Sequence, residues 1–170
     1  MKKGLSRKTF ERAKVAPTQF DRALEIVVAV LAFMTILMAV FFYTRLSEQI
    51  PIHFDWKFVP NGYGSKENIL FLQGLMLLVV LVMWLGTMFP GMVNLPVKRN
   101  PEKEVEQQAL LCRCCRVIAI WVVVIFLFIT LAMASPLWNF SVAVWRFPIL
   151  LSVIGIIGTI IYYSIKINRV

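Results

Sequence analysis

The side chains best suited to chemistry in this 170-residue chain gather in one short segment, residues 45–67. It holds the only histidine, His53, with Asp55 two residues on and Asn61 and Lys66 further along. An imidazole near carboxylates can bind a transition metal or act as acid and base. A zinc site needs three or four protein ligands, however, and a hydrolase needs a nucleophile beside its base. We therefore expect no enzyme, metal or cofactor, and predict His53, Asp55, Asn61 and Lys66 as binding residues.

A second group of potential ligands is the cysteine cluster Cys112, Cys114 and Cys115. A CxCC arrangement could hold a soft metal or carry a lipid, but structural zinc takes four ligands at fixed separations and no histidine lies nearby. We therefore predict reduced thiols with no assigned role.

A regular alternation of side chains over residues 50–58 determines how the candidate residues are positioned. The apolar members are Ile50, Ile52, Phe54, Trp56 and Phe58. A period of two predicts an extended strand with one apolar face, which should rest on helix ends, while His53 and Asp55 are neighbours on the other face. Pro60-Asn61-Gly62 predicts a turn. The segment is therefore expected to be a short β-hairpin-like loop.

Four long apolar runs, one before this loop and three after it, make up nearly half of the chain. They cover residues 24–43, 68–89, 117–134 and 147–165, and each is close to the ~20 residues that cross a ~30 Å hydrocarbon core. Hydrophobic residues reach 59% and mean hydropathy is +0.77, which excludes a water-soluble core. We predict an all-α membrane protein: a four-transmembrane-helix bundle over residues 24–170, with residues 1–23 as a basic tail.

The distribution of basic residues predicts the orientation of the bundle. Only four of the 18 lysines and arginines lie on the side of the 45–67 loop, namely Arg45, Lys57, Lys66 and Arg146. The positive-inside rule then places both termini and the middle loop in the cytoplasm and the 45–67 loop outside it. Topology thus accounts for the net charge of +9, so we expect the lipid bilayer, and no nucleic acid, as the partner of these charges.

Weaker patterns concern the ends and faces of the spans. Thr18 and Asp21 have the spacing of a capping box, which predicts a helix start. Residues 101–111 form a helical pattern expected to run into the third span. In the last span, Gly155 and Thr159 form a small-xxx-small pair, which would serve packing within the bundle or an oligomer.

The loop also carries a resemblance to a known family. Ile50-Pro51-Ile52-His53-Phe54-Asp55 and then Asn61-Gly62-Tyr63-Gly64-Ser65-Lys66 are similar to the signature of the bacterial domain-of-unknown-function family sixteen-forty-eight. That domain is the N-terminal part of SdpI-type toxin-immunity membrane proteins. The resemblance covers residues 24–78 and continues weakly at residues 94–97. Phe58 and Asn61 stand where the family usually has Gly and Asp.

The resemblance implies a multi-pass protein of the bacterial cytoplasmic (inner) membrane. Its extracytoplasmic loop would recognise a secreted peptide, a toxin or a membrane partner, as in immunity or signalling. Two other hypotheses stay open. The chain could be a structural or accessory subunit whose loop locks the first two spans together, or His53 and Asp55 could form a metal or hydrolytic site with Glu48 or Glu67.

Overall fold

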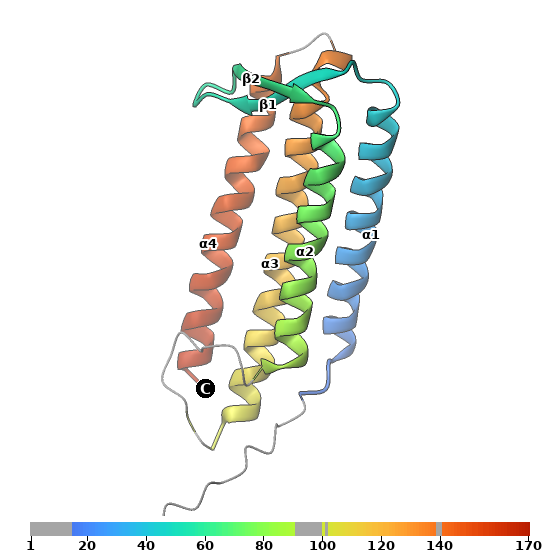
Figure 1. Cartoon of the computed structure of the whole chain (residues 1–170). Helices are drawn as coiled ribbons and strands as arrows, with labels where there is room; N and C mark the ends of the chain where they lie inside the picture. The colour runs from blue at the N-terminus through green and yellow to red at the C-terminus, as the bar shows by residue number, and fades with distance from the viewer. Residues whose placement is uncertain (1–14, 91–99, 101, 139–140) are drawn as a thin grey trace, which may run out of the picture.

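The computed structural model describes residues 15–90, 100, 102–138 and 141–170, so the predictions for residues 1–14 and 94–97 lie outside the described residues. The bundle consists of α1 (Gln19–Tyr43), α2 (Asn68–Met88), α3 (Glu104–Met133) and α4 (Arg146–Asn168). Strands β1 (Gln49–Phe54) and β2 (Pro60–Ser65) join α1 to α2, and the short helices η2 (Ser135–Leu137) and η3 (Val142–Trp145) join α3 to α4. Figure 1 shows the strands lying across one end of the bundle, here called the hairpin end. The opposite end, where α1 begins and α4 ends, is called the terminal end.

All four helices are long and apolar enough to span a membrane, as the sequence predicts. The shortest, α2, has 21 residues and is therefore about 32 Å long, which matches a ~30 Å hydrocarbon core. Helix α3 has 30 residues and begins at Glu104, which confirms that the helical pattern of the middle loop runs into the third span. Large apolar side chains are exposed along α1, α2 and α4, as expected of lipid-facing surfaces, whereas α3 exposes only Val105 in its first turn. The chain is thus a multi-pass membrane protein.

Helix α1 begins where the capping pattern predicts. The Thr18 hydroxyl accepts a hydrogen bond from the Asp21 backbone N–H, and the Asp21 carboxylate accepts one from the Thr18 backbone N–H at 2.9 Å. The first backbone N–H groups of a helix have no acceptor within the helix. Here Thr18 and Asp21 each accept a hydrogen bond from the backbone N–H of the other.

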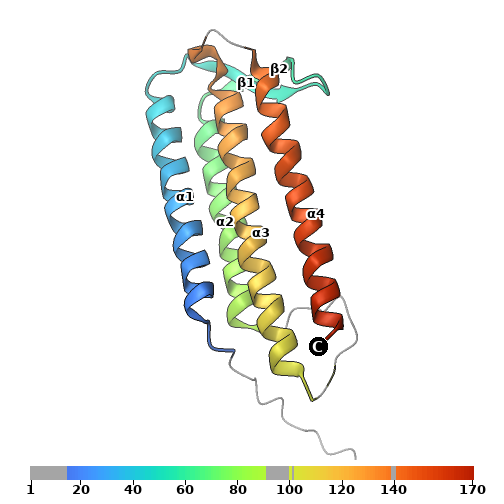
Figure 2. The same cartoon turned by 180° about the vertical axis from the view of Figure 1, so that it is seen from behind.

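Helix α3 is central to the bundle and packs against each of the other three helices (Figures 1 and 2). Two of its polar contacts join it to neighbouring helices within the spans. The Gln73 amide of α2 donates a 2.9 Å hydrogen bond to the Thr130 hydroxyl, and the Trp121 indole donates a 3.2 Å bond to the Thr159 hydroxyl of α4. Such bonds between transmembrane helices each contribute about 0.6–2 kcal/mol.

The small-residue face of α4 packs against α3. A Cβ atom on Gly155 would lie 2.6 Å from the Trp121 ring, whereas one on Gly158 would have no described atom within 4 Å. Gly155 therefore serves close packing inside the bundle, and an oligomer through the last span stays a prediction.

The sequence correctly predicts a hairpin between the first two spans but misplaces its turn. Strand β1 ends at Phe54 instead of continuing to Phe58, and Pro60-Asn61-Gly62, the predicted turn, forms the first half of β2. The expected apolar face is correspondingly incomplete. Ile50 is fully buried, but Trp56 is 80% exposed and does not rest on the helix ends. Asp55 explains the error, because its carboxylate closes a turn inside what appears in sequence as a continuous alternation.

Candidate functional site

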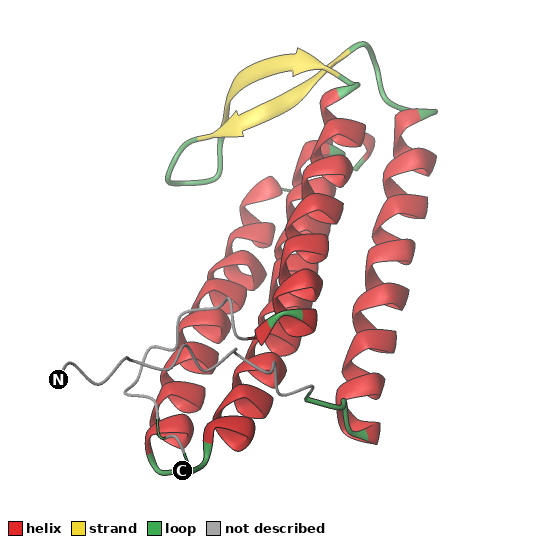
Figure 3. Cartoon of the chain, turned by 60° about the horizontal axis from the view of Figure 1, so that its bottom comes forward, coloured by secondary structure: helices red, strands yellow, loops and turns green. Residues whose placement is uncertain are grey.

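The base of the hairpin is anchored to the bundle by apolar packing. Leu46 and Ile50 lie in a buried apolar cluster with Phe42 of α1 and Ile69 of α2. Met133 and Ala134, at the end of α3, complete this cluster. Figure 3 shows the strands leaving the helices beyond this point, with the turn extending away from the bundle. The base is thus fixed by packing, and the far half of the hairpin relies on its own contacts.

Asp55 holds the turn together. One oxygen of its carboxylate accepts hydrogen bonds from the backbone N–H groups of Lys57 and Val59, both at 2.8 Å. Two backbone bonds, Asp55 N–H to Val59 and Phe58 N–H to Asp55, close the same turn at 2.9 Å each. An Asp that satisfies the backbone a few residues ahead is a common turn-former. Asp55 is therefore committed to the fold of the loop.

Phe58 completes the turn in an uncommon conformation. Its φ of 63° lies in the left-handed region, which costs a residue with a Cβ roughly 1–2 kcal/mol. The ring stacks on Phe54 with centroids 5.8 Å apart, and such pairs contribute about 0.5–1.5 kcal/mol. The family resemblance places Gly at this position, so the structure explains that preference: the backbone favours glycine, and here a ring contact offsets the strain.

His53 and Asn61 are brought together across the two strands. The His53 Nδ1–H donates to the Asn61 Oδ1 at 2.5 Å. His53 pairs with Gly62 in the strand register, and a Cβ on Gly62 would lie 2.9 Å from the His53 Cβ. Gly62 is thus required for the close approach that sets this pair.

Lys66 closes the hairpin at its base, far from the turn. Its ammonium lies 2.7 Å from the Glu48 carboxylate, and its backbone N–H donates to the Glu48 carbonyl at 3.0 Å. The hydrogen bond that Lys66 donates to Glu48 raises the pKa of Lys66 above its ordinary value of 10.5. The adjacent Glu67, at the start of α2, accepts a hydrogen bond from Ser65 that lowers its pKa below 4.5. The ion pair ties the two strand ends together.

The four predicted site residues therefore do not form one constellation. His53 and Asn61 make a pair in the strands, Asp55 serves the turn, and Lys66 serves the base. Among the described residues no group of three or more His, Cys, Asp or Glu side chains could hold a metal ion. These four residues place no nucleophile beside a base, and each of the four contributes to the shape of the hairpin.

Exposed apolar side chains on the hairpin are the feature that sequence reasoning missed. Trp56, Val59 and Tyr63 are each more than half exposed, and Ile52 is 42% exposed; together these four residues are called the hairpin apolar surface. The Lys57 ammonium lies 5.1 Å from the Trp56 ring centroid, which adds a charge to this surface. The alternating sequence contains these residues, but the same pattern equally predicts an apolar face packed on the helix ends.

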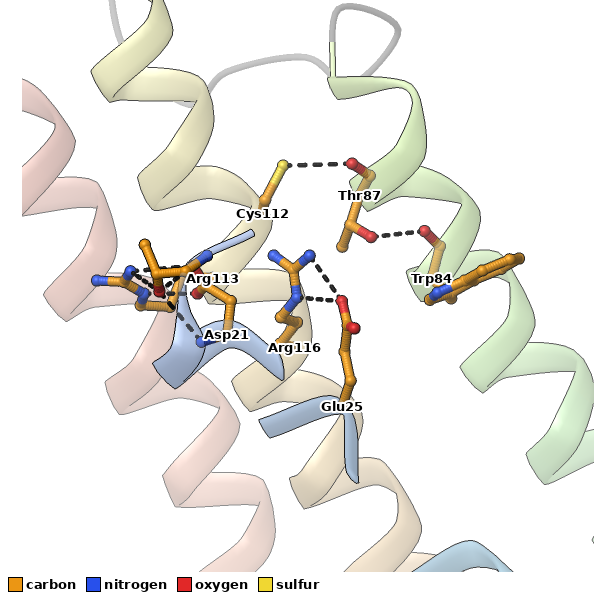
Figure 4. A network of polar contacts seen from close by, with 8 residues as sticks. Asp21, Glu25, Trp84, Thr87, Cys112, Arg113 and Arg116 are labelled. Atoms are coloured by element: carbon orange, nitrogen blue, oxygen red, sulfur yellow. Dashed lines mark hydrogen bonds and ion pairs between the residues drawn. The ribbon is translucent and has the colours of Figure 1, made fainter. Parts of the chain in front are cut away.

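A second missed feature is a polar network at the terminal end of the bundle (Figure 4). The Arg113 guanidinium donates to the Asp21 carboxylate at 2.8 Å, and Arg116 lies 2.7 Å from Glu25. Arg116 is only 8% exposed. The i, i+4 spacing of the acids and the i, i+3 spacing of the arginines could have indicated matching helix faces.

The part of the chain that matches a known family lies in α1, the hairpin and α2. Residues 30–77 match the family model described as Domain of unknown function (DUF1648). This confirms the resemblance seen in the loop signature. The DUF1648 match covers the second half of α1, the whole hairpin and the first half of α2. No curated protein and no solved structure matches the chain.

Proposed function

We propose that this protein presents the hairpin as an extracytoplasmic recognition element in the bacterial inner membrane, binding a secreted peptide or a membrane partner in an SdpI-like immunity or signalling role. The proposal assigns no catalysis, metal or cofactor to the chain. The DUF1648 match supports the kinship on which the immunity role rests, since the loop signature lies inside it.

The observation that carries the proposal is the hairpin apolar surface. A two-stranded hairpin in water gains nothing from exposing Trp56 and Tyr63, which are 80% and 63% exposed. Aromatic side chains of this kind are enriched at the centres of protein interfaces. The polar signature residues hold the hairpin in shape, so they preorganise a surface that the apolar residues supply.

Charge supports the proposed orientation. At the described helix ends, the hairpin side carries Arg45, Lys57, Lys66 and Arg146, while the terminal end carries Arg22, Lys103, Arg113, Arg116, Lys166 and Arg169. The N-terminal tail adds six more basic residues to the terminal side of the sequence. Under the positive-inside rule the hairpin then faces away from the cytoplasm.

The second candidate is a structural or accessory subunit with no ligand of its own. It is favoured by the way the signature residues satisfy one another: His53 with Asn61, Lys66 with Glu48, and Asp55 with the turn. In that case the hairpin would act as a clamp between α1 and α2, and its apolar residues would contact only lipid or neighbouring subunits.

The test compares complementation of a deletion strain by matched variants. Trp56→Ser removes an exposed aromatic from the hairpin, and Phe71→Ser removes one that is 73% exposed on α2. We expect Trp56→Ser to keep wild-type membrane abundance, measured by immunoblot, and to lose the growth or signalling phenotype. Phe71→Ser should keep both. Full complementation by Trp56→Ser would refute the recognition role.

His53→Ala separates the two candidates. If His53 only shapes the hairpin, its loss removes one exposed hydrogen bond, at a cost of about 0.5–1.5 kcal/mol, and activity should fall in proportion to abundance. If the hairpin is a recognition element, activity should fall further than abundance does. The comparison requires both quantities from the same membranes.

A further inference from the structure

A groove opens between α1 and α2 in the terminal half of the bundle, away from the hairpin. Its volume is about 480 Å³. Ala29 and Phe33 of α1 and Leu77 and Leu81 of α2 line its walls, and Ala32 lies beneath them, buried against α3. Phe33, Leu77 and Leu81 are each about half exposed, so the groove opens to the outer surface of the helices, where lipid lies.

One end of this groove is charged. Glu25, Thr87 and Arg116 line it, and Figure 4 shows the Glu25 and Arg116 side chains meeting between α1 and α3 with Thr87 and Trp84 on α2 nearby. The Arg116 Nε and Nη2 atoms both contact the same oxygen of Glu25, at 2.7 Å each. Among the described residues the other Glu25 oxygen has no hydrogen-bond donor, and the Glu25 side chain is 34% exposed.

The position of the groove along the bundle fits one leaflet of a bilayer. Thr87 is the residue before the last of α2, so the charged end lies at the level where this helix leaves the membrane. From Thr87 the lining of α2 extends to Leu77, about 15 Å at 1.5 Å per residue. That length is half of a ~30 Å hydrocarbon core.

The length and the lining of the groove point to a hydrocarbon chain as its occupant. Its walls are apolar along most of the roughly 15 Å that it follows on α2, and its polar side chains gather at one end. A single acyl chain within one leaflet has this length and this distribution of polarity.

We propose that the groove binds one acyl chain of a phospholipid of the phosphatidylethanolamine type from the leaflet at the terminal end. The headgroup then lies at the Glu25–Arg116 pair. A mouth with one guanidinium and one carboxylate matches a zwitterion: the phosphate accepts hydrogen bonds from Arg116, and the primary ammonium donates to the second oxygen of Glu25. This inference does not depend on the function proposed for the hairpin.

The test fills the groove from its exposed wall. Ala29→Phe places a ring in the groove, while Ala23→Phe makes the same change at an exposed position of α1 outside the groove lining. Delipidated protein in detergent is titrated with phosphatidylethanolamine, and native mass spectrometry counts the bound lipids. We expect wild type and Ala23→Phe to bind one lipid at least about tenfold more tightly than Ala29→Phe does.

Equal binding by Ala29→Phe and wild type would overturn the proposal, as would a wild-type lipid series with no tight first site. A wild-type dimer that becomes monomeric in Ala29→Phe would assign the groove to a second copy and overturn it too.

The headgroup is tested separately. Wild type should bind phosphatidylcholine more weakly than phosphatidylethanolamine, because a trimethylammonium group has no N–H to donate to Glu25. Glu25→Gln, which leaves the groove walls intact, should abolish this preference while the acyl chain still binds. Equal binding of the two lipids by wild type, or a preference for phosphatidylglycerol, would overturn the headgroup assignment.

Discussion

Two glycines one turn apart on α4 offer a matched test of how the last helix is held. At Gly155 an added Cβ would lie 2.6, 2.7 and 2.8 Å from three atoms of the Trp121 ring, but at Gly158 it would meet no described atom within 4 Å. The same substitution, Gly→Ala, therefore creates a clash at one position and none at the other. The ring cannot simply shift aside without disturbing the 3.2 Å hydrogen bond from Trp121 to Thr159.

The expected magnitudes follow from two opposing effects. Replacing a helical glycine by alanine stabilises the helix by about 0.5–1 kcal/mol at either position. At Gly155 an overpacking penalty of about 1–3 kcal/mol opposes this stabilisation. Because the helix effect is common to both variants, Gly155→Ala should be less stable than Gly158→Ala by about 1–3 kcal/mol, while Gly158→Ala should equal or exceed wild type.

Unfolding of the purified protein in mixed micelles, followed by circular dichroism during titration with a denaturing detergent, measures this difference. Trp121→Leu supplies the control, since removing the ring should bring Gly155→Ala to the level of Gly158→Ala. Equal stabilities of the two alanine variants in the wild-type background would refute the packing of Gly155 against Trp121. A destabilisation that depends on protein concentration would place Gly155 in an interface between copies.

Three further predictions concern the hairpin and the terminal end. Phe58→Gly should be more stable than Phe58→Ala by about 1–2 kcal/mol, since both lose the ring and only alanine retains the left-handed strain; thermal unfolding measures this, and equal stabilities would contradict the turn geometry. Asp21→Asn should destabilise the protein by about 1.5–3 kcal/mol because it removes the charge partner of Arg113, whose side chain is 24% exposed, whereas Glu48→Gln, which alters a carboxylate that is 80% exposed, should cost under about 1 kcal/mol. In a chain without native cysteines, Asn61→Cys should react with an impermeant thiol reagent in intact spheroplasts and Asn100→Cys should not; the reverse pattern would invert the proposed orientation.

The helices could be predicted from sequence because their signals are local. Hydropathy over about 20 residues identifies a span whatever its neighbours are, and the capping box at Thr18 and Asp21 involves residues three apart. The hairpin could be predicted only in part. Alternation continues through Trp56 and Phe58, and nothing in a period of two distinguishes a strand from a turn whose apolar residues happen to be exposed.

The contacts that fix the candidate site are not local, which is why sequence reasoning missed them. Arg116 finds Glu25 across 91 residues of chain, and no pattern within either helix requires that pairing. Similarly, the sequence spacing suggests that His53 and Asp55 are neighbours. In the structure, the bulged register between β1 and β2 brings His53 into contact with Asn61 instead. A small register shift is enough to exchange partners in a strand pair.

The anchoring of the hairpin base has a consequence for the order of biosynthesis. Met133 and Ala134, which cover Leu46 and Ile50, are synthesised roughly 70 residues after β2 ends, a delay of several seconds at ~5–20 residues per second. During that interval the hairpin has been made but its apolar base has no third helix to cover it. Its own cross-strand contacts, from the Asp55 turn to the Lys66–Glu48 ion pair, must then keep it in shape. The residues of the loop signature would then stabilise the hairpin during synthesis, before the end of α3 that packs against its base has been made.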